Sequence, residues 1–267
     1  MAHVLWFALL LVQGVNPAQV SEHLSFGAPS VGATGKRLIV REGYALLHDD
    51  DSKTPVWVSY RLTREYAIRK VARSNDYRPD PDLPLGCRAE LSDYAGSGWS
   101  RGHFCPANDS GRSRKVMSEC FYLSNMAPQD QTVNGGLWAT IEDYAHQVAR
   151  RFGDVTIITG PVYRRSLPDR SRKTVRIGLN QVAVPTWLYK IVVRREAGGR
   201  VRVLAFEVPN APVRGGRAAV PQYLVSVRRV ERDTGLNFLN ALPTAVQDRV
   251  ERPRPRKLWA LGTGGWN

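Results

Sequence analysis

Residues 119–142 read ECFYLSNMAPQDQTVNGGLWATIE, and this stretch decides the fold. Its first part, Glu119–Leu123, is rich in apolar and aromatic residues and predicts a strand. Apolar residues then recur at helical spacing, which predicts a long helix from about Thr132 to Arg151. The stripe that would face the core consists of Leu137, Ile141, Tyr144 and Val148.

Two polar residues near the start of this helix could hold a metal ion. Asn134 and Glu142 are eight positions apart, which in an α-helix separates them by about 80° around the axis and about 12 Å along it. An amide oxygen is a hard, neutral ligand that suits Mg²⁺. A carboxylate one layer further out can orient the waters bound to the metal. Taken singly, Asn134 is better explained as a helix cap and Glu142 as a solvated charge.

A glycine-rich segment upstream carries a histidine beside an arginine. Residues 93–109 read DYAGSGWSRGHFCPAND, and glycines allow the backbone of such a loop to approach a ligand closely. The imidazole of His103 has a pKa suited to a general base that activates water. Arg101 could stabilise negative charge that develops on phosphorus. The other histidines have ordinary structural or exposed roles as their simplest explanation.

The rest of the chain predicts several strands grouped around few helices. A second helix is expected at Val220–Thr234. Because strands and helices do not alternate regularly, an α+β fold is favoured over a doubly wound sheet. Besides Glu119–Leu123, the predicted strands are Arg37–Val40, Gly43–Leu47, Val56–Leu62, Val155–Thr159, Gln181–Val184, Thr186–Val193 and Val201–Val208.

The charge balance indicates a polyanionic partner. The chain has 38 Lys and Arg against 24 Asp and Glu among 267 residues, a formal net charge of +14. Its hydrophobic fraction of 43% excludes wholesale disorder and its length is sufficient for a substantial core. Nucleic acid, an anionic membrane or an acidic polysaccharide would all suit this charge.

The two ends of the chain differ in character from the middle. Residues 1–18 contain a nine-residue apolar run followed by small residues, which predicts a signal peptide and a secreted or periplasmic protein. The segment lacks the Lys or Arg that usually precedes such a run, and a buried N-terminal helix or strand is the alternative. We expect one domain over residues 19–245. Residues 246–267 form a basic C-terminal tail that we expect to be solvated and disordered.

Several ordered motifs make the chain resemble the DNA/RNA non-specific endonucleases of the ββα-metal type. That family carries an Asp-Arg-Gly-His box, then an Asn-x-x-Pro-Gln-like turn, then a helix with Asn, Trp and Glu at N-x-x-x-W-x-x-x-E spacing. Blocks that look like the family extend over nearly the whole chain after residue 20. The corresponding residues here are Arg101-Gly102-His103, Asn125–Gln129, Asn134, Trp138 and Glu142.

This resemblance implies a fold and a mechanism. The fold would be a mainly antiparallel central sheet flanked by helices, with the catalytic strand hairpin and the metal-bearing helix on one side. His103 would be the general base and Asn134 the direct protein ligand of a single Mg²⁺, for which Mn²⁺ could substitute. Glu142 would hold metal-bound water, and Arg101 would stabilise the transition state. The substrates would be DNA and RNA, cleaved to 5′-phosphate ends, with no membrane partner for the mature chain.

Three features depart from the family or are left open by it. Ser100 occupies the position where the family usually has Asp, so a catalytically impaired nucleic-acid-binding protein on the same scaffold is the alternative function. Cys105 and Cys120 stand at usually small positions and could pair or remain thiols. Among Arg73, Arg78 and Arg88 we favour Arg73 as the upstream arginine that binds substrate. Monomer and homodimer remain equally compatible with the sequence.

Overall fold

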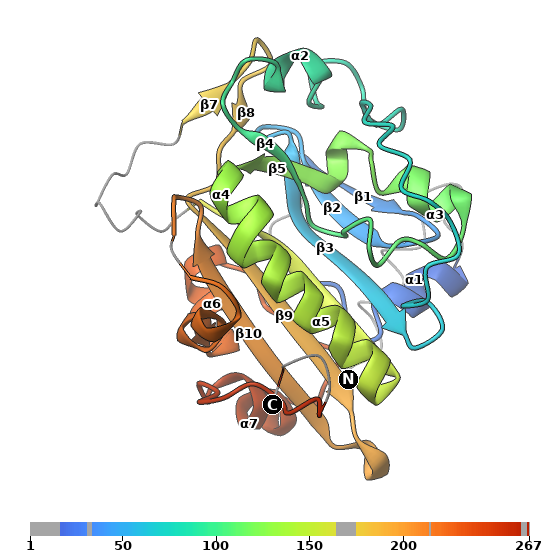
Figure 1. The fold of residues 1–267 in the computed structure, drawn as a ribbon, viewed down its shortest axis with the longest axis vertical. Helices are drawn as coiled ribbons and strands as arrows, with labels where there is room; N and C mark the ends of the chain where they lie inside the picture. The colour runs from blue at the N-terminus through green and yellow to red at the C-terminus, as the bar shows by residue number, and fades with distance from the viewer. Residues whose placement is uncertain (1–16, 31–33, 164–174, 214, 263–265, 267) are drawn as a thin grey trace.

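A seven-stranded sheet forms the centre of the computed structural model, which describes residues 17–30, 34–163, 175–213, 215–262 and 266. Every pair of neighbouring strands in this sheet is antiparallel. Helices lie on both faces, so the fold is α+β as the sequence predicts (Figure 1). From one edge to the other the strands are β1 (Lys36–Val40), β2 (Ala45–Asp49), β3 (Thr54–Thr63), β6 (Asp154–Val162), β9 (Trp187–Arg195), β10 (Val201–Pro209) and β11 (Leu224–Val225).

Both faces of the sheet are apolar because its central strands are buried on both sides. Successive side chains of a strand point to opposite faces, so Ile157 and Ile158 of β6 belong to two different hydrophobic cores. Helix α5 (Ala139–Phe152) packs against the first face. The second face is covered by α1 (Pro17–His23), α6 (Val227–Thr234) and α7 (Thr244–Glu251). No helix in the described parts of the chain is long and apolar enough to cross a membrane.

A small antiparallel hairpin lies on the α5 side of the molecule. Its strands are β4 (Ser100–His103) and β5 (Met126–Gln129), and α4 (Gln131–Val133) follows directly. A π-helical turn, Asn134–Trp138, then continues into α5. The remaining short elements are α2 (Leu91–Tyr94), α3 (Arg114–Glu119), β7 (Arg176–Ile177) and β8 (Val182–Ala183).

Two predicted elements differ from the observed ones. The predicted strand Glu119–Leu123 is wrong, because α3 ends at Glu119 and a 3₁₀ turn occupies Leu123–Asn125. The Asn125 amide donates to the carbonyls of Cys105 and Cys120, which holds this segment compact, and the strand begins only at Met126. The predicted helix Val220–Thr234 begins late. Ser226 caps α6 by accepting from the Arg229 amide, and Pro221 lies in a preceding 3₁₀ turn.

The two cysteines of the hairpin region remain thiols. Cys105 and Cys120 are both buried and free. The Cys105 sulfur lies 3.6 Å from the Ser110 hydroxyl, and the Cys120 thiol donates to the Met117 carbonyl at 3.1 Å. Each thiol therefore has its own polar neighbour in the core, and the structure answers the open question of pairing in favour of two buried thiols.

The basic C-terminal tail is folded against the domain, so the prediction of a disordered end is wrong for its described residues. The Tyr144 hydroxyl of α5 donates to the Trp259 carbonyl at 3.2 Å and accepts from the Trp259 backbone N–H at 2.8 Å. The Trp266 indole donates to Asp143 at 3.1 Å. Apolar side chains in the tail, among them Leu261 and Trp266, belong to the α5-side core. The free energy gained by burying these apolar side chains outweighs the conformational entropy that the tail loses on becoming ordered.

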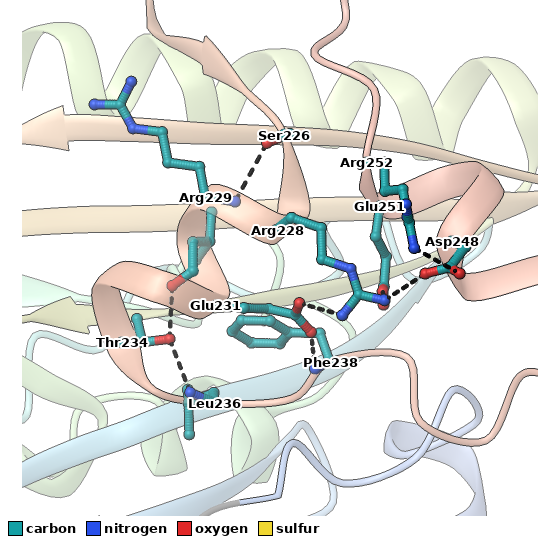
Figure 2. A network of polar contacts seen from close by, with 11 residues as sticks. Ser226, Arg228, Arg229, Glu231, Thr234, Leu236, Phe238, Asp248, Glu251 and Arg252 are labelled. Atoms are coloured by element: carbon teal, nitrogen blue, oxygen red, sulfur yellow. Dashed lines mark hydrogen bonds and ion pairs between the residues drawn. The ribbon is translucent and has the colours of Figure 1, made fainter. Parts of the chain in front are cut away.

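On the opposite face a polar network joins α6 to α7 (Figure 2). Arg228 of α6 lies at its centre and forms ion pairs with Glu231 at 2.7 Å, Asp248 at 2.9 Å and Glu251 at 3.0 Å. The Glu251 side chain is fully buried, whereas Arg228 is 39% exposed. Glu231 also accepts from the Phe238 amide and so fixes the segment after α6. The network therefore links three segments that are apart in sequence.

Glu251→Gln is expected to flatten the pH dependence of stability. Burial, followed by the charge of Glu231, raises the pKa of Glu251 to about 7, and Arg228 only partly opposes this. A raised carboxyl pKa contributes stability that is fully present below its ordinary value of 4.5 and is lost as pH rises through about 7. Glutamine cannot ionise. The unfolding free energy, measured in urea, should therefore fall less between pH 5 and pH 8 in the variant than in the wild-type chain. An equal fall in both would show that Glu251 does not cause this pH dependence.

Candidate active site

The hairpin positions His103 at the end of β4, where it pairs with Met126 of β5. The residue is only 9% exposed. Its ring packs edge-on against Phe121, with ring centroids 5.0 Å apart, and lies 5.7 Å from the ring of Tyr77. The Nε2 atom is buried and has no hydrogen-bond partner among the described residues. A buried ring nitrogen without a partner is costly, which indicates that it is held for a group that binds there.

The two arginines predicted for the site flank the same aromatic rings. The Arg101 guanidinium lies 4.1 Å from the Tyr77 ring centroid, and that of Arg73 lies 4.9 Å from the Phe121 ring centroid. Both side chains are exposed. The rival arginines are engaged elsewhere. Among their contacts, Arg78 bonds Asp76 and Ser118, and Arg88 bonds Glu90.

Burial lowers the pKa of His103 to about 3, and the charges of Arg73 and Arg101 contribute in the same direction. The imidazole is therefore neutral at physiological pH and able to accept a proton. A phosphate bound between the arginines would offset their charges and raise the histidine pKa in the complex. The site thus combines a neutral base with two cations that face solvent.

Removing the Arg73 charge should shift the acid limb of activity. Because Arg73 lowers the pKa of His103, Arg73→Gln is expected to raise that pKa, so activity is lost at a higher pH. The pH dependence of kcat/KM reports the free enzyme and is the measurement to make. Arg78→Gln is the control, since Arg78 is paired with Asp76. An acid limb that stays in place in Arg73→Gln, or moves to lower pH, would refute the coupling.

Asn134 is free for a ligand because another residue caps the helix. The Asp130 side chain accepts from the amides of Thr132 and Val133, which is the capping role that the sequence left open for Asn134. Within the described residues no hydrogen bond engages the Asn134 side-chain amide. Asn134 also begins the π-helical turn. A π turn holds more residues than an α turn. It therefore reduces the angle around the helix axis between Asn134 and Glu142 below the roughly 80° of a regular α-helix.

Glu142 lies in a buried polar pocket that sequence reasoning missed in part. Its side chain is 17% exposed, and Oε1 lies 3.9 Å from the Nζ atom of Lys190, which is fully buried on β9. The same Nζ atom lies 4.8 Å from the Trp138 ring centroid. Burial raises the pKa of Glu142 and lowers that of Lys190, and their mutual attraction opposes both shifts. Burial thus disfavours the charged form of both groups, and their 3.9 Å separation leaves room for a further polar partner.

His103 and Glu142 belong to one electrostatic environment. The charge of Arg73 lowers the pKa of both groups. Asp109 adds a further carboxylate behind Glu142 and raises its pKa. Asp109 is itself held by the Tyr60 hydroxyl at 2.9 Å and His146 at 2.7 Å. His146 therefore has a structural role, as the sequence indicated for the histidines other than His103.

Gln129 belongs to one of the family motifs, but the sequence assigned it no role in the site. It is fully buried, and both polar atoms of its amide lack partners among the described residues. It pairs across the hairpin with Ser100, the position where the family usually has Asp. Its side chain also covers Gly102, where an added Cβ would lie 2.0 Å from the Gln129 Cδ atom. Gly102 is therefore required by this close approach of the Gln129 side chain.

Gly102→Ala should test that packing against a matched control. The clash is expected to cost about 1–3 kcal/mol of unfolding free energy and to displace Gln129. Gly135→Ala changes a glycine with nothing within 4 Å of the added Cβ, and helix propensity should make it stabilising by about 0.5–1 kcal/mol. Urea unfolding distinguishes the two. Equal stability of both variants would show that the Gln129 side chain can leave Gly102 freely.

The residues fit a hydrated metal ion better than a closed metal centre. Among the described residues, no group of three or more His, Cys, Asp or Glu side chains could hold a metal. Buried polar atoms without partners nevertheless gather here: His103 Nε2, Glu142 Oε1 and the Gln129 amide. Mg²⁺ keeps most of its waters and needs few protein ligands. One amide ligand from Asn134, with waters that satisfy the unpartnered atoms, is consistent with this donor set.

Comparison with known proteins assigns the chain to a family. The DNA/RNA non-specific endonuclease family matches residues 21–245, and the chain belongs to this family. It is 38% identical over 223 residues to the zebrafish protein named Nuclease EXOG, mitochondrial, covering 81% of this chain and 64% of that protein. It is 34% identical to human Endonuclease G, mitochondrial, covering 82% of this chain and 73% of that protein. The chain thus spans somewhat less than two thirds of the EXOG sequence.

A solved structure shows the same fold. The crystal structure described as the EndoG/EndoGI complex superposes with a TM-score of 0.77 at 29% sequence identity, over 86% of this chain and 94% of that chain. The fold class inferred from the sequence is confirmed by this match.

The predicted secretion is corrected by the same relatives. EXOG, Endonuclease G and Nuclease 1 of fission yeast are all named as mitochondrial proteins, so the comparisons point to mitochondria rather than to a secreted or periplasmic location. The predicted signal peptide falls mostly outside the described residues, since only Pro17 and Ala18 are seen, in α1. The missing basic residue ahead of the apolar run was the sequence feature that opposed export.

Proposed function

We propose that the chain is a Mg²⁺-dependent, sugar-non-specific endonuclease that hydrolyses phosphodiester bonds of DNA and RNA to 5′-phosphate and 3′-hydroxyl ends. The observation that carries this proposal is the neutral, buried His103 between two exposed arginines, with an unpartnered Nε2 atom. An anion attracted by the arginines would meet a base that is free to accept a proton. Membership of the endonuclease family supports the same chemistry.

In the proposed mechanism His103 acts on water. Its Nε2 atom accepts a proton as the water oxygen attacks phosphorus in line with the 3′-oxygen. The bond from phosphorus to the 3′-oxygen breaks as the new bond forms, and the 3′-oxygen takes a proton from a second water to leave as the 3′-hydroxyl. Arg101 stabilises the negative charge that grows on the phosphoryl oxygens, and Arg73 binds the substrate phosphate. A Mg²⁺ ion bound by Asn134, or Mn²⁺ in its place, would neutralise charge on a non-bridging oxygen and on the leaving oxygen. Glu142, with its buried Oε1, accepts hydrogen bonds from water on the metal side of the site.

The proposed lack of sequence specificity follows from what the site presents. Arg73 and Arg101 are groups that bind phosphate and carry no information about base identity on their own. Affinity should then arise mainly from Lys and Arg contacts to the backbone and fall steeply with salt. The net charge of +14 supplies such contacts. Both DNA and RNA offer the same phosphodiester.

The alternative function is a catalytically impaired nucleic-acid-binding protein on this scaffold. Ser100 is the observation that favours it, because the site lacks a carboxylate that the family usually has at the start of the hairpin. Ser100 is half-buried and paired with Gln129. Loss of one negative charge would weaken metal affinity without removing His103, Asn134 or Glu142. We therefore favour an active enzyme with a higher metal requirement.

The termini of the products test the proposed reaction. Single-stranded DNA and RNA oligonucleotides with blocked ends should be cut internally in Mg²⁺ and remain intact in EDTA. The new 5′ ends should resist labelling by polynucleotide kinase until phosphatase is added, because they carry phosphate. Immediate labelling would refute the proposed direction of cleavage. Binding without any cleavage in Mg²⁺ or Mn²⁺ would establish the alternative function.

A further inference from the structure

A large basic groove lies away from the candidate active site. It has a volume of about 1310 Å³ and is formed by the end of α5, the hairpin between β9 and β10, and the C-terminal tail (Figure 1). Seven Lys and Arg residues line it and no Asp or Glu does. This volume exceeds the roughly 300–1,000 Å³ of small-molecule sites. Its size and charge suit a segment of an anionic polymer.

The cations of the groove fall into two groups. Arg194, Arg200 and Arg202 of the hairpin share Glu196, and Arg217 pairs with Asp143, so the charge of these four is partly neutralised. Arg249, Arg256 and Lys257 are exposed, and within the described parts of the chain no carboxylate pairs with them. These three side chains, which we call the groove triad, leave positive charge available to a ligand.

The tail gives the groove a fixed shape. Trp259 lines it and is held by Tyr144 of α5 through two hydrogen bonds. Its indole packs edge-on against Phe152 and contacts the Arg194 guanidinium, 4.8 Å from a ring centroid, so it holds this cation at the groove. Pro253 and Pro255 line the same wall. Because the backbone is held by packing and by proline, the groove triad is presented on an ordered surface.

The groove lies at an edge of the sheet, where Phe152 lines it from the α5 side and Arg249 from the α7 side. The candidate active site lies at the opposite end of the helix that Phe152 ends. Asn134 begins the π-helical turn and Phe152, which lines the groove, ends α5. Eighteen residues separate them, which corresponds to about 27 Å of helix. Phosphates follow each other every roughly 3.4 Å along one strand of a duplex, so about eight nucleotides span this distance.

We propose that this groove is a second binding surface for the nucleic acid substrate, which holds the backbone at least about eight nucleotides from the bond to be cut. The inference rests on the proposed function, because it takes the ligand of the active site to be a phosphodiester chain. The groove then makes affinity depend on substrate length. Short oligonucleotides reach the active site alone, and longer ones reach both surfaces.

Binding measurements on a neutralised groove test this proposal. The variant is Arg249→Gln/Arg256→Gln/Lys257→Gln. The control, Arg37→Gln/Arg61→Gln/Arg232→Gln, removes the same formal charge from residues outside the groove. Fluorescence anisotropy with a 30-base-pair DNA duplex (the 30-mer) and a DNA hairpin with a 6-base-pair stem (the 6-mer), in EDTA at several salt concentrations, gives the affinities. Thermal unfolding midpoints check that both variants are folded.

The groove variant should bind the 30-mer at least about tenfold more weakly than the control, with the slope of log K against log salt smaller by about 3 for three lost contacts. Binding of the 6-mer should be unchanged. Equal binding of the 30-mer by both variants would overturn the proposal, as would an equal loss for the two lengths. Polyglutamate serves as a third probe in the same assay. If the groove variant lost binding to polyglutamate but bound the 30-mer like the control, the proposal would be overturned in favour of an acidic protein partner.

The same experiment separates this proposal from the proposed function. Binding in EDTA does not depend on cleavage. If wild-type chain fails to cut in Mg²⁺ but binds the 30-mer through the groove triad, the enzymatic proposal fails and the groove is retained as a binding surface. If the chain cuts and the groove variant binds like the control, the groove proposal fails alone.

Discussion

Replacing His103 with alanine is expected to lower kcat on DNA by about 10²–10⁴-fold, the range typical of a lost general base. The unpartnered Nε2 atom and the lowered pKa both indicate a neutral imidazole held for proton transfer. Substrate affinity should change little, because the phosphate-binding groups are Arg73 and Arg101. Single-turnover cleavage in saturating Mg²⁺ measures the chemical step directly.

Two further variants separate catalysis from packing at this position. His103→Gln keeps a polar side chain against Phe121 and should lose activity to a similar extent as alanine. His48→Gln is the matched control, since His48 is another buried histidine whose Nε2 lies 2.7 Å from the Cys87 carbonyl. It should lose stability and retain kcat. A His103→Ala enzyme that is folded and within about tenfold of wild-type kcat would exclude the general-base role.

Asn134→Ala is expected to raise the Mg²⁺ concentration for half-maximal activity by at least about tenfold, the scale seen even for outer-shell metal contacts. The reason is that Asn134 offers the amide proposed as the direct ligand, and Asp130 already performs the capping. Asn134→Asp supplies a carboxylate oxygen at the same place and should restore a low Mg²⁺ requirement. Activity is measured against Mg²⁺ concentration for each variant.

Asp130→Ala is the control for helix integrity in the same series. Loss of this cap should cost about 0.5–2 kcal/mol of stability and leave the Mg²⁺ requirement unchanged. If Asn134→Ala and Asp130→Ala raised the requirement equally, the effect would come from the helix terminus. The proposed ligand role of Asn134 would then be wrong.

The parts of the site that follow local rules could be predicted from the sequence. The helix beginning near Thr132 shows strong apolar periodicity, and it is observed with Asn134 and Glu142 near its start. His103 was singled out by its glycine-rich surroundings, and it lies on the hairpin beside that helix. The family motifs added the order of these elements along the chain. Each of these signals is contained in a short window of residues.

The missed residues depend on contacts between distant segments. Lys190 lies in an apolar strand and approaches Glu142 only because β9 passes under α5. Gln129 ends a short strand, and its closeness to Gly102 comes from hairpin pairing. A lone lysine in the run WLYKIVV was the available signal for the first, because a buried lysine needs a charged partner. The π-helical turn has no comparable signal.

The tail shows how charge can mislead a prediction. Its arginines and prolines suggest a solvated end, yet Trp259 and Trp266 anchor it to Tyr144 and Asp143 of α5. Two tryptophans in a short basic segment were the signal that burial was available. The ordered tail also completes the groove proposed as a second surface for the substrate.

Cleavage of closed circular plasmid DNA is the measurement that tests the central claim most directly. A closed circle has no ends, so its conversion to nicked and linear forms requires internal hydrolysis. Wild-type chain should produce these forms in Mg²⁺ and none in EDTA, and folded His103→Ala should be slower by about 10²–10⁴-fold. An intact plasmid in both Mg²⁺ and Mn²⁺, or equal cutting by wild type and His103→Ala, would contradict the proposed activity of this site.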